Sequence, residues 1–191
     1  MNFWKEIWDN KGKSDSNDLL WLCGREHLDI TWDSKKESHY IKDLIDFQET
    51  DKILEVGCGA GFLSREFQTS DFTGIDYSKP LIEKHKKLYP EHNVFVSESN
   101  VLPFEDNQFD KLFCSGVFQY LPDLQYTEDT IKEFIRVTKK SILILDLKKQ
   151  ITNPNHYCIE LDTLEKFGFK VIDCIYDEMK ETNYNTYLEL K

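Results

Sequence analysis

Long apolar runs are missing from this sequence, and their absence limits where the chain can function. No stretch approaches the roughly 20 apolar residues that a membrane-spanning helix needs. The first residues, MNFWKEIWDN, have neither the basic start nor the apolar centre of a secretory signal. We therefore expect a cytoplasmic protein with no membrane partner.

Basic residues are scarce relative to acidic ones. Lys and Arg number 24 against 35 Asp and Glu, so the formal net charge is −11. Nucleic-acid binding generally needs Lys and Arg clustered on one face. The balance argues against a nucleic-acid partner and favours a small molecule, and we expect the chain to be a monomer or a homodimer.

Motifs for metal binding and for a nucleophilic serine are absent. The five cysteines include no C-x-x-C pair, and the five histidines show no metal-ligand spacing. Neither H-E-x-x-H nor G-x-S-x-G occurs. We expect no metal and interpret Cys58 and Cys114 as small side chains that fill tight places. His39, His85 and His92 fall on helix faces or linkers and are assigned to the surface.

Strand and helix patterns alternate along most of the chain. Apolar runs predict strands at residues 52–56, 72–75, 93–96, 109–114, 141–147, 169–176 and 184–190. Helical patterns fall at residues 38–47, 62–68, 78–89, 128–138 and 161–167. This alternation is typical of an α/β doubly wound sheet of seven strands, mostly parallel, with helices on both faces. The linker DEMKETN is too short for a crossover helix, so the last strand should be antiparallel.

Three glycines follow the first predicted strand in ILEVGCGAGFLS, at Gly57, Gly59 and Gly61. Glycine weakens a fold unless the backbone needs its freedom, so this turn predicts a ligand lying against the backbone. A nicotinamide fingerprint would need a third glycine where Phe62 stands, and no Gly-Lys-Ser/Thr follows for a P-loop. Asp76 ends the next strand about 20 residues later, which is a recurrent position for an acid that binds ribose hydroxyls.

The ordered segments ILEVGCGAG, FTGIDYS and LPFEDNQFDKLFCSGVFQYLPD resemble motifs of the class I S-adenosylmethionine-dependent methyltransferases. The resemblance covers residues 52–147 closely and points to the small-molecule, ubiquinone-biosynthesis-type branch. It implies a Rossmann-like fold, S-adenosylmethionine as methyl donor and S-adenosylhomocysteine as product. The donor-binding positions that it implies are Glu55, Gly57, Cys58, Gly59, Gly61, Asp76, Tyr77, Glu98, Ser99, Ser115 and Gly116.

The resemblance also implies separate roles within this set. Glu55 would orient the glycine turn or the ammonium group of the donor, and Asp76 would bind the ribose. Tyr77, Glu98 and Ser99 would lie near the adenine. The segment after the fourth strand would run along the methionine portion.

One domain, residues 1–191, is expected from the length of the chain. In related enzymes a helical N-terminal extension covers the pocket. Residues 1–37 are therefore assigned as a helical lid that contacts the acceptor, and residues 38–191 as the donor-binding core.

Fewer features of the sequence identify the residues that bind the acceptor. His27, His156 and Tyr120 are the candidate catalytic groups, and Tyr120 stands where the family often has histidine. Tyr120 and His156 are also candidate acceptor contacts. Lys13 and Arg25 join them because a local basic cluster in an acidic protein suits an anion.

Methyl transfer from a sulfonium needs mainly the alignment of donor and acceptor. We expect transfer to oxygen of a small anionic, phosphorylated or nucleotide-linked metabolite, with precursors of surface glycans as the acceptor class. Three alternatives stay open: N-methylation of a small amine, a non-catalytic S-adenosylmethionine-binding module, and a nicotinamide oxidoreductase, against which Phe62 counts.

Overall fold

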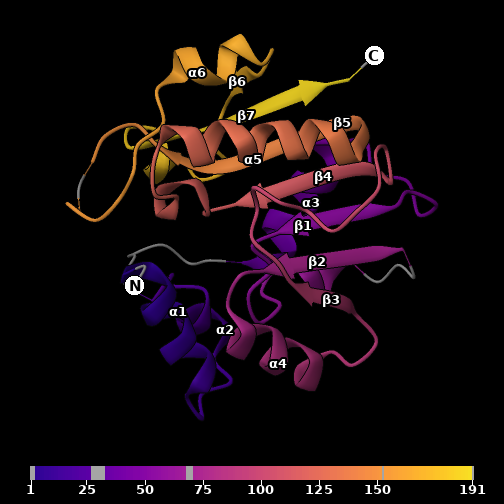
Figure 1. The fold of residues 1–191 in the computed structure, drawn as a ribbon, viewed down its shortest axis with the longest axis vertical. Coiled ribbons are helices and arrows are strands. Elements are labelled where there is room, and N and C mark those ends of the chain that lie inside the picture. Colours follow the sequence, from indigo (N-terminus) through magenta and orange to yellow (C-terminus); the bar gives the residue numbers. More distant parts are fainter. Residues whose placement is uncertain (1–2, 27–32, 68–70, 152, 191) are drawn as a thin grey trace.

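In the computed structural model, which describes residues 3–26, 33–67, 71–151 and 153–190, a single sheet has helices on both faces (Figure 1). Its strands are β1 Ile53–Val56, β2 Phe72–Asp76, β3 Asn93–Val96, β4 Phe109–Ser115, β5 Thr138–Lys148, β6 Lys170–Ile172 and β7 Asn183–Glu189. Their order across the sheet is β3-β2-β1-β4-β5-β7-β6. β7 runs antiparallel to its neighbours β5 and β6, and the other pairs are parallel. The predicted mixed sheet of seven strands is confirmed.

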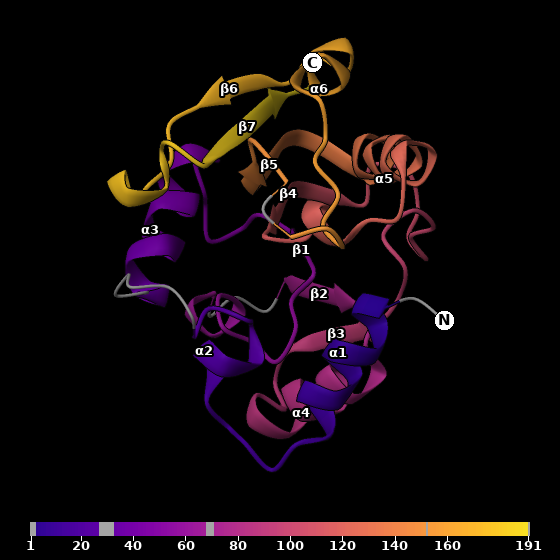
Figure 2. The same cartoon turned by 90° about the vertical axis from the view of Figure 1, so that its left-hand side faces the viewer.

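The helices surround this sheet. They are α1 Phe3–Lys13, α2 Leu19–Leu22, α3 Ser34–Leu44, α4 Lys79–Leu88, α5 Leu124–Val137 and α6 Leu161–Lys166, with single 3-10 turns η1 Ser64–Glu66, η2 Phe118–Tyr120 and η3 Asp177–Met179. Figure 2 shows α3 and α5 on opposite faces of the sheet.

The central strands are apolar on both sides because successive side chains enter two different cores. In β4, Leu112 packs with residues of α5 and α6, such as Phe134 and Leu164. The next residue, Phe113, packs on the other face with Ile41 of α3. This period of two explains why the strands read as continuous apolar runs in the sequence.

The segment after the glycine turn departs from the predicted helix at residues 62–68. Within residues 62–67, which the structure describes, only the 3-10 turn Ser64–Glu66 forms. Phe67 leaves the turn with φ −102° and ψ 80° and is fully buried, with its ring stacked on that of Phe113 at a centroid distance of 4.9 Å. The turn ends because burial of this ring directs the chain into the core.

Other helices and strands begin or end at residues that differ from the predicted ones, for local reasons. α3 begins at Ser34, ahead of the predicted start at residue 38, because the carboxylate of Asp33 accepts two backbone N–H groups of the first turn. Asp123 likewise caps α5, which starts four residues earlier than predicted. The strand predicted at residues 169–176 is confined to Lys170–Ile172.

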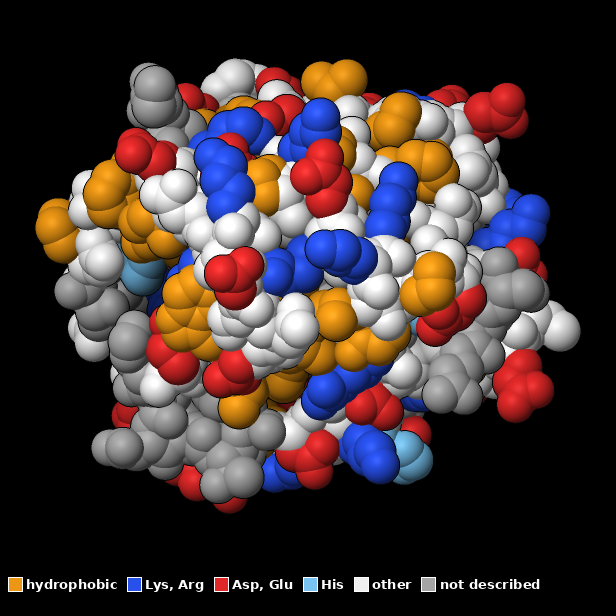
Figure 3. Space-filling view, turned by 90° about the horizontal axis from the view of Figure 1, so that it is seen from below, with side chains coloured by type: hydrophobic (Ala, Val, Ile, Leu, Met, Phe, Trp, Pro, Cys, Tyr) orange, Lys and Arg blue, Asp and Glu red, His pale blue; other side chains and the backbone are white. Residues whose placement is uncertain are grey.

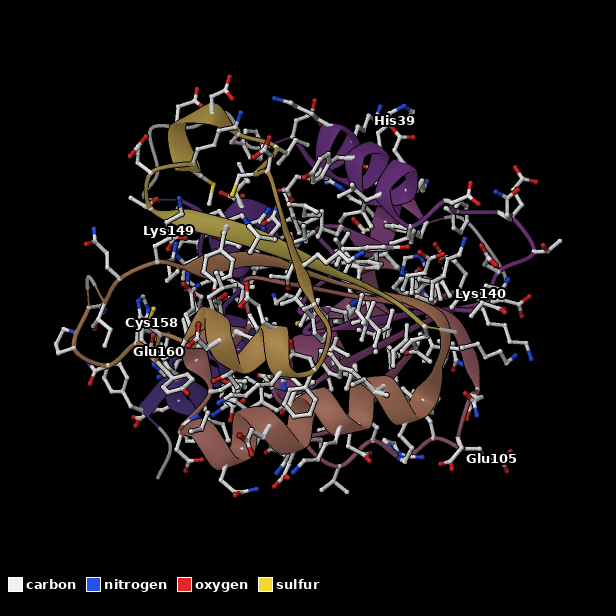
Figure 4. All side chains as sticks on the ribbon, turned by 90° about the horizontal axis from the view of Figure 1, so that it is seen from above. His39, Glu105, Lys140, Lys149, Cys158 and Glu160 are labelled. Carbon is white, nitrogen blue, oxygen red and sulfur yellow. The ribbon has the colours of Figure 1, made fainter. Side chains whose placement is uncertain are left out.

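Of the histidines assigned to the surface, His85 is instead fully buried and His92 is partly buried, so that prediction is wrong. His85 of α4 is fully buried, and its Nδ1 lies 3.0 Å from the carbonyl oxygen of Gly59. Its Nε2 lies 3.0 Å from Nδ1 of His92, whose side chain is 6% exposed. Burial lowers the pKa of His85 to about 4, so the neutral ring donates its Nδ1–H to the carbonyl. His39 is exposed on α3, as expected (Figure 4).

The outer surface mixes charges of both signs. Figure 3 shows Lys and Arg side chains interspersed with Asp and Glu on the face seen from below. Among the helices within the described ranges, none has both the length and the apolar character needed to cross a membrane.

The N-terminal helix α1 docks on α4 through a glycine. A Cβ added at Gly12 would lie 2.6 Å from the backbone nitrogen of Leu81. The two helix backbones therefore approach more closely than any side chain at this position would allow. The contact holds Trp8, which is buried on the same helix, beside the ends of β1 and β2.

We predict that Gly12→Ala lowers the free energy of unfolding by about 1–3 kcal/mol, because the overlap with a backbone atom outweighs the better helix propensity of alanine. Urea unfolding measures this change. Asn10→Ala, on the exposed side of the same helix, is the matched control and should be nearly neutral. Equal stability of the two variants would contradict the close packing of α1 on α4.

Candidate functional site

A cavity of about 360 Å³ lies at the carboxyl ends of β1, β2, β4 and β5. The turns that follow these strands form its floor, and residues 22–25 with Trp8 of α1 form part of its wall. This is the edge where parallel α/β sheets bind ligands. Most of the residues predicted to bind a donor line it, as described below.

The glycine turn after β1 has three residues with positive φ: Gly57 at 81°, Gly59 at 49° and Gly61 at 102°. A Cβ at Gly57 would lie 2.2 Å from Cγ2 of Val117, whereas a Cβ at Gly59 would meet nothing within 4 Å. Gly57 and Gly59 line the cavity. Gly61 does not line it, and a Cβ there would lie 2.8 Å from the ring of Tyr89. The third glycine therefore serves packing against the end of α4.

Asp76 connects this turn to the next strand. Its Oδ2 accepts the backbone N–H of Gly59 at 3.0 Å, and its Oδ1 accepts that of Ser78 at 2.8 Å. Burial raises the pKa of Asp76 to about 6, although the two N–H groups favour the ionised form. The carboxylate thus lies at the cavity wall, positioned by backbone groups.

Glu55 and Cys58 lie on either side of Gly57 and also line the cavity. Glu55 is buried, and its Oε2 has no hydrogen-bond partner among the described residues. Burial, together with the nearby charge of Asp76, raises its pKa to about 8. Burial likewise raises the pKa of the Cys58 thiol, which suits its interpretation as a filler. An orphaned acid facing a cavity is suited to a cationic ligand group.

One end of the cavity is bordered by Tyr77, Glu98 and Ser99. Nζ of Lys5 lies 4.7 Å from the centre of the Tyr77 ring and 3.9 Å from Oε1 of Glu98. Tyr126, which sequence reasoning missed, donates its hydroxyl to Oε2 of Glu98 at 2.9 Å. An aromatic face, a carboxylate and hydroxyl groups thus meet at this end.

Beyond the end of β4, Ser115 and Gly116 line the middle of the cavity. The hydroxyl of Ser115 accepts a hydrogen bond from Nη2 of Arg25 at 3.1 Å, and Nη1 of Arg25 pairs with Oε2 of Glu37 at 2.5 Å. Gly116 has φ 69°, and its N–H donates to the carbonyl of Leu145 on β5. Arg25 is thus a buried part of the wall, held by α3.

One member of the predicted basic cluster around Arg25 lies outside the cavity. Lys13 is exposed at the end of α1 and does not line the cavity, which corrects its assignment to the acceptor site. Lys11 pairs with Glu26 at 2.7 Å. Glu26 lies beside Lys11 and Glu37 lies beside Arg25, so the positive charge of each of these two cations is neutralised locally.

Tyr120 and His156 come together on the remaining wall, with ring centroids 5.5 Å apart. Trp4 of α1 stacks on His156 at 4.8 Å. Nδ1 of His156 is buried and lacks a hydrogen-bond partner within the described ranges. Burial and the charge of Lys148 lower the pKa of His156, so the ring is neutral at pH 7. His27, the other histidine candidate, lies outside the residues that the structure describes.

Several cavity residues escaped the sequence analysis: Gln119, Tyr126, Asp146 and Lys148. Asp146 carried the one available signal, since it is an acid that interrupts the apolar strand SILILDL near its end. The others look like ordinary surface or core residues until the fold brings them together. Among the described side chains, no group of three or more His, Cys, Asp or Glu is arranged to hold a metal ion.

Comparison with known proteins agrees with this geometry. Residues 54–145 match the family described as "Methyltransferase domain". The putative methyltransferase YrhH of Bacillus subtilis is 26% identical over 121 residues, which cover 59% of this chain and 67% of that protein. A 2-phytyl-1,4-naphtoquinone methyltransferase of Nostoc sp. is 29% identical over 105 residues, covering 49% and 46% respectively. The chain spans about half the length of the curated relatives it matches.

The fold has relatives among solved structures. The magnesium protoporphyrin IX methyltransferase of Synechocystis, determined with bound S-adenosylhomocysteine, superimposes with a TM-score of 0.65 at 11% identity, covering 100% of this chain and 96% of that one. Residues 54–145 are therefore similar to a methyltransferase domain, and the Rossmann-like fold of the chain is the one seen in this solved methyltransferase.

The two cavity-lining glycines should respond differently to alanine. We predict that Gly57→Ala lowers the free energy of unfolding by about 2–4 kcal/mol, because positive φ is combined with overlap on Val117. Gly59→Ala should lower it by only about 1 kcal/mol, because its Cβ enters open space. Thermal or urea unfolding compares the two. Val117→Ala should restore part of the stability lost in Gly57→Ala, and no such rescue would contradict the overlap.

Proposed function

We propose that this protein transfers a methyl group from S-adenosylmethionine to a hydroxyl oxygen of a small-molecule acceptor. The observation that carries the proposal is the wall formed by Glu55, the bare backbone at Gly59 and Asp76 around a single cavity. The matched methyltransferase domain and the names of the relatives support the reaction class.

The residues present fit the donor on structural grounds. The orphaned Oε2 of Glu55 suits an ammonium group, which would complete its hydrogen bonding. The empty space above Gly59 suits a ligand lying on the backbone. Asp76 would accept ribose hydroxyls, while Tyr77 and Glu98 would meet the adenine. When bound, S-adenosylmethionine would supply an electrophilic methyl group on sulfur.

The acceptor would occupy the part of the cavity near Arg25, Tyr120 and His156. The aromatic side chains there would exclude water and orient the acceptor for in-line transfer. Burial raises the pKa of Tyr120, so its hydroxyl stays protonated and can donate a hydrogen bond. The neutral imidazole of His156 can accept one.

Charge at this end of the cavity favours a neutral hydroxyl over a cationic amine. Arg25 pairs with Glu37, and Nζ of Lys148 lies 3.6 Å from Oδ1 of Asp146. Two cations thus meet two carboxylates, so this end as a whole has no excess of negative charge that would select a cationic amine as acceptor. For the same reason the prediction of a phosphorylated glycan precursor gains less support, since each cation already has an acidic partner.

Ligand titration tests the proposal. We expect purified protein to bind S-adenosylmethionine and S-adenosylhomocysteine and not NAD, as measured by calorimetry. Gly59→Ala should weaken binding of both sulfur ligands at least about tenfold, because a methyl group at this position projects into the cavity. Asn10→Ala, remote on the exposed side of α1, should bind like the wild type. Absence of binding by the folded wild-type protein would overturn the proposed function.

Donor affinity should also depend on pH through Glu55. Its pKa of about 8 means that the acid is mostly protonated at pH 7, whereas an ammonium partner favours the ionised form. Binding should therefore release a proton, and affinity should rise up to about tenfold per pH unit towards pH 8, then level off. Calorimetry in buffers of different ionisation enthalpy counts the released proton. Glu55→Gln should bind more weakly and lose this dependence; an unchanged pH profile in that variant would disprove the role.

A further inference from the structure

Asp146 has an unusual backbone conformation for its position. Three non-glycine residues of the described chain have positive φ: Asp46 at 49°, Asn107 at 55° and Asp146 at 61°. The first two are exposed in turns, whereas Asp146 lies near the end of β5 and lines the cavity. A left-handed conformation is unfavourable for a residue with a side chain, and such strain is often found at functional sites.

Strand β7 of the sheet holds the positive-φ conformation of Asp146 from one side. The register between β5 and β7 shifts between Ile144 and Leu147, so the chain bulges at Asp146. The Asp146 N–H donates to Oδ1 of Asn185 at 2.9 Å. Nδ2 of Asn183 donates to Oδ1 of Asp146. Both asparagines are buried on β7, so the neighbouring strand fixes the backbone and one carboxylate oxygen.

The second carboxylate oxygen is left for a ligand. None of the hydrogen bonds within the described residues uses Oδ2 of Asp146, and this atom would lie 3.3 Å from a Cβ built at Gly116. Because Gly116 has no side chain, Oδ2 can lie this close to the turn after β4. Gly116 and Ser115 are the residues that the proposed donor would pass, and they line the cavity together with Asp146. Asp146 therefore lies where the donor and acceptor parts of the cavity would meet.

We propose that Asp146 is a catalytic residue that accepts a hydrogen bond from the reacting hydroxyl of the acceptor and then takes its proton. This inference rests on the proposed function. As the acceptor oxygen forms its bond to the methyl carbon, the carbon–sulfur bond breaks, its electron pair stays on sulfur, and the hydroxyl proton passes to the Asp146 carboxylate. Solvent then removes that proton, so no further reactant is needed.

The charged neighbours of Asp146 define what this group can bind. Nζ of Lys148 lies 3.6 Å from the oxygen that Asn183 also holds, and the charge of Arg25 acts on the same carboxylate. The contacts from Lys148 and Asn183 are made to Oδ1, so they orient the carboxylate without occupying Oδ2. His156 belongs to the aromatic wall, stacked on Trp4, and is a second polar contact for the acceptor.

Binding of sinefungin tests whether the Asp146 carboxylate lies beside the transferred methyl group, and it can be measured although the acceptor is unidentified. In this analogue of S-adenosylmethionine, a carbon that bears an ammonium group replaces the methylated sulfur, so the charge stands where the methyl group would be. Wild-type protein should bind sinefungin about tenfold more tightly than S-adenosylhomocysteine, because the ammonium group reaches the Asp146 carboxylate. Calorimetric titration of both ligands gives the ratio.

Asp146→Asn should abolish this preference while affinity for S-adenosylhomocysteine stays near that of the wild type. Asparagine keeps the shape and tolerates positive φ, and Asp146→Gly, which fits the same φ, is a second variant. Asn10→Ala, on the exposed side of α1 and outside the cavity, is the control and should leave the ratio unchanged. An unaltered ratio in both Asp146 variants would overturn the inference, whereas loss of S-adenosylhomocysteine binding by the wild type would overturn the proposed function itself.

Discussion

The hydrogen bonds of Asp76 are the interaction on which the candidate site depends. One carboxylate at the end of β2 accepts the N–H of Gly59 after β1 and the N–H of Ser78 at the start of α4. It therefore fixes the turn, the strand and the helix relative to one another. Both N–H groups would lose this hydrogen-bond partner if the side chain were lost, so the geometry of the cavity floor and the stability of the fold are coupled here.

The glycine turn is supported from every side except that of the cavity. The N–H groups of Gly57 and Cys58 both donate to the carbonyl of Ile75, and His85 donates to the carbonyl of Gly59. The backbone groups that point inward are thus satisfied by the protein. What faces the cavity is bare backbone at Gly59, and a rigid floor of this kind holds a ligand with little rearrangement.

The sequence predicts the sheet and the donor side of the cavity well, because both depend on local patterns: apolar runs of strand length, a glycine turn and an acid ending the next strand. Prediction from the sequence fails for contacts between segments that are far apart in the chain. His85 stands among lysines and reads as surface, but the fold buries it against the carbonyl of Gly59 in the turn. The helix expected after the turn is lost because Phe67 enters the core. The acceptor side depends on Asp146, whose orientation is set by asparagines nearly 40 residues later.

A crystal structure of the protein with S-adenosylhomocysteine would show directly how the cavity binds the donor product. The ligand should lie over Gly59, with its ribose hydroxyls on Asp76, its amino group on Oε2 of Glu55 and its sulfur directed towards Asp146. A ligand bound elsewhere, or one in this cavity with its amino group away from Glu55, would contradict this binding mode.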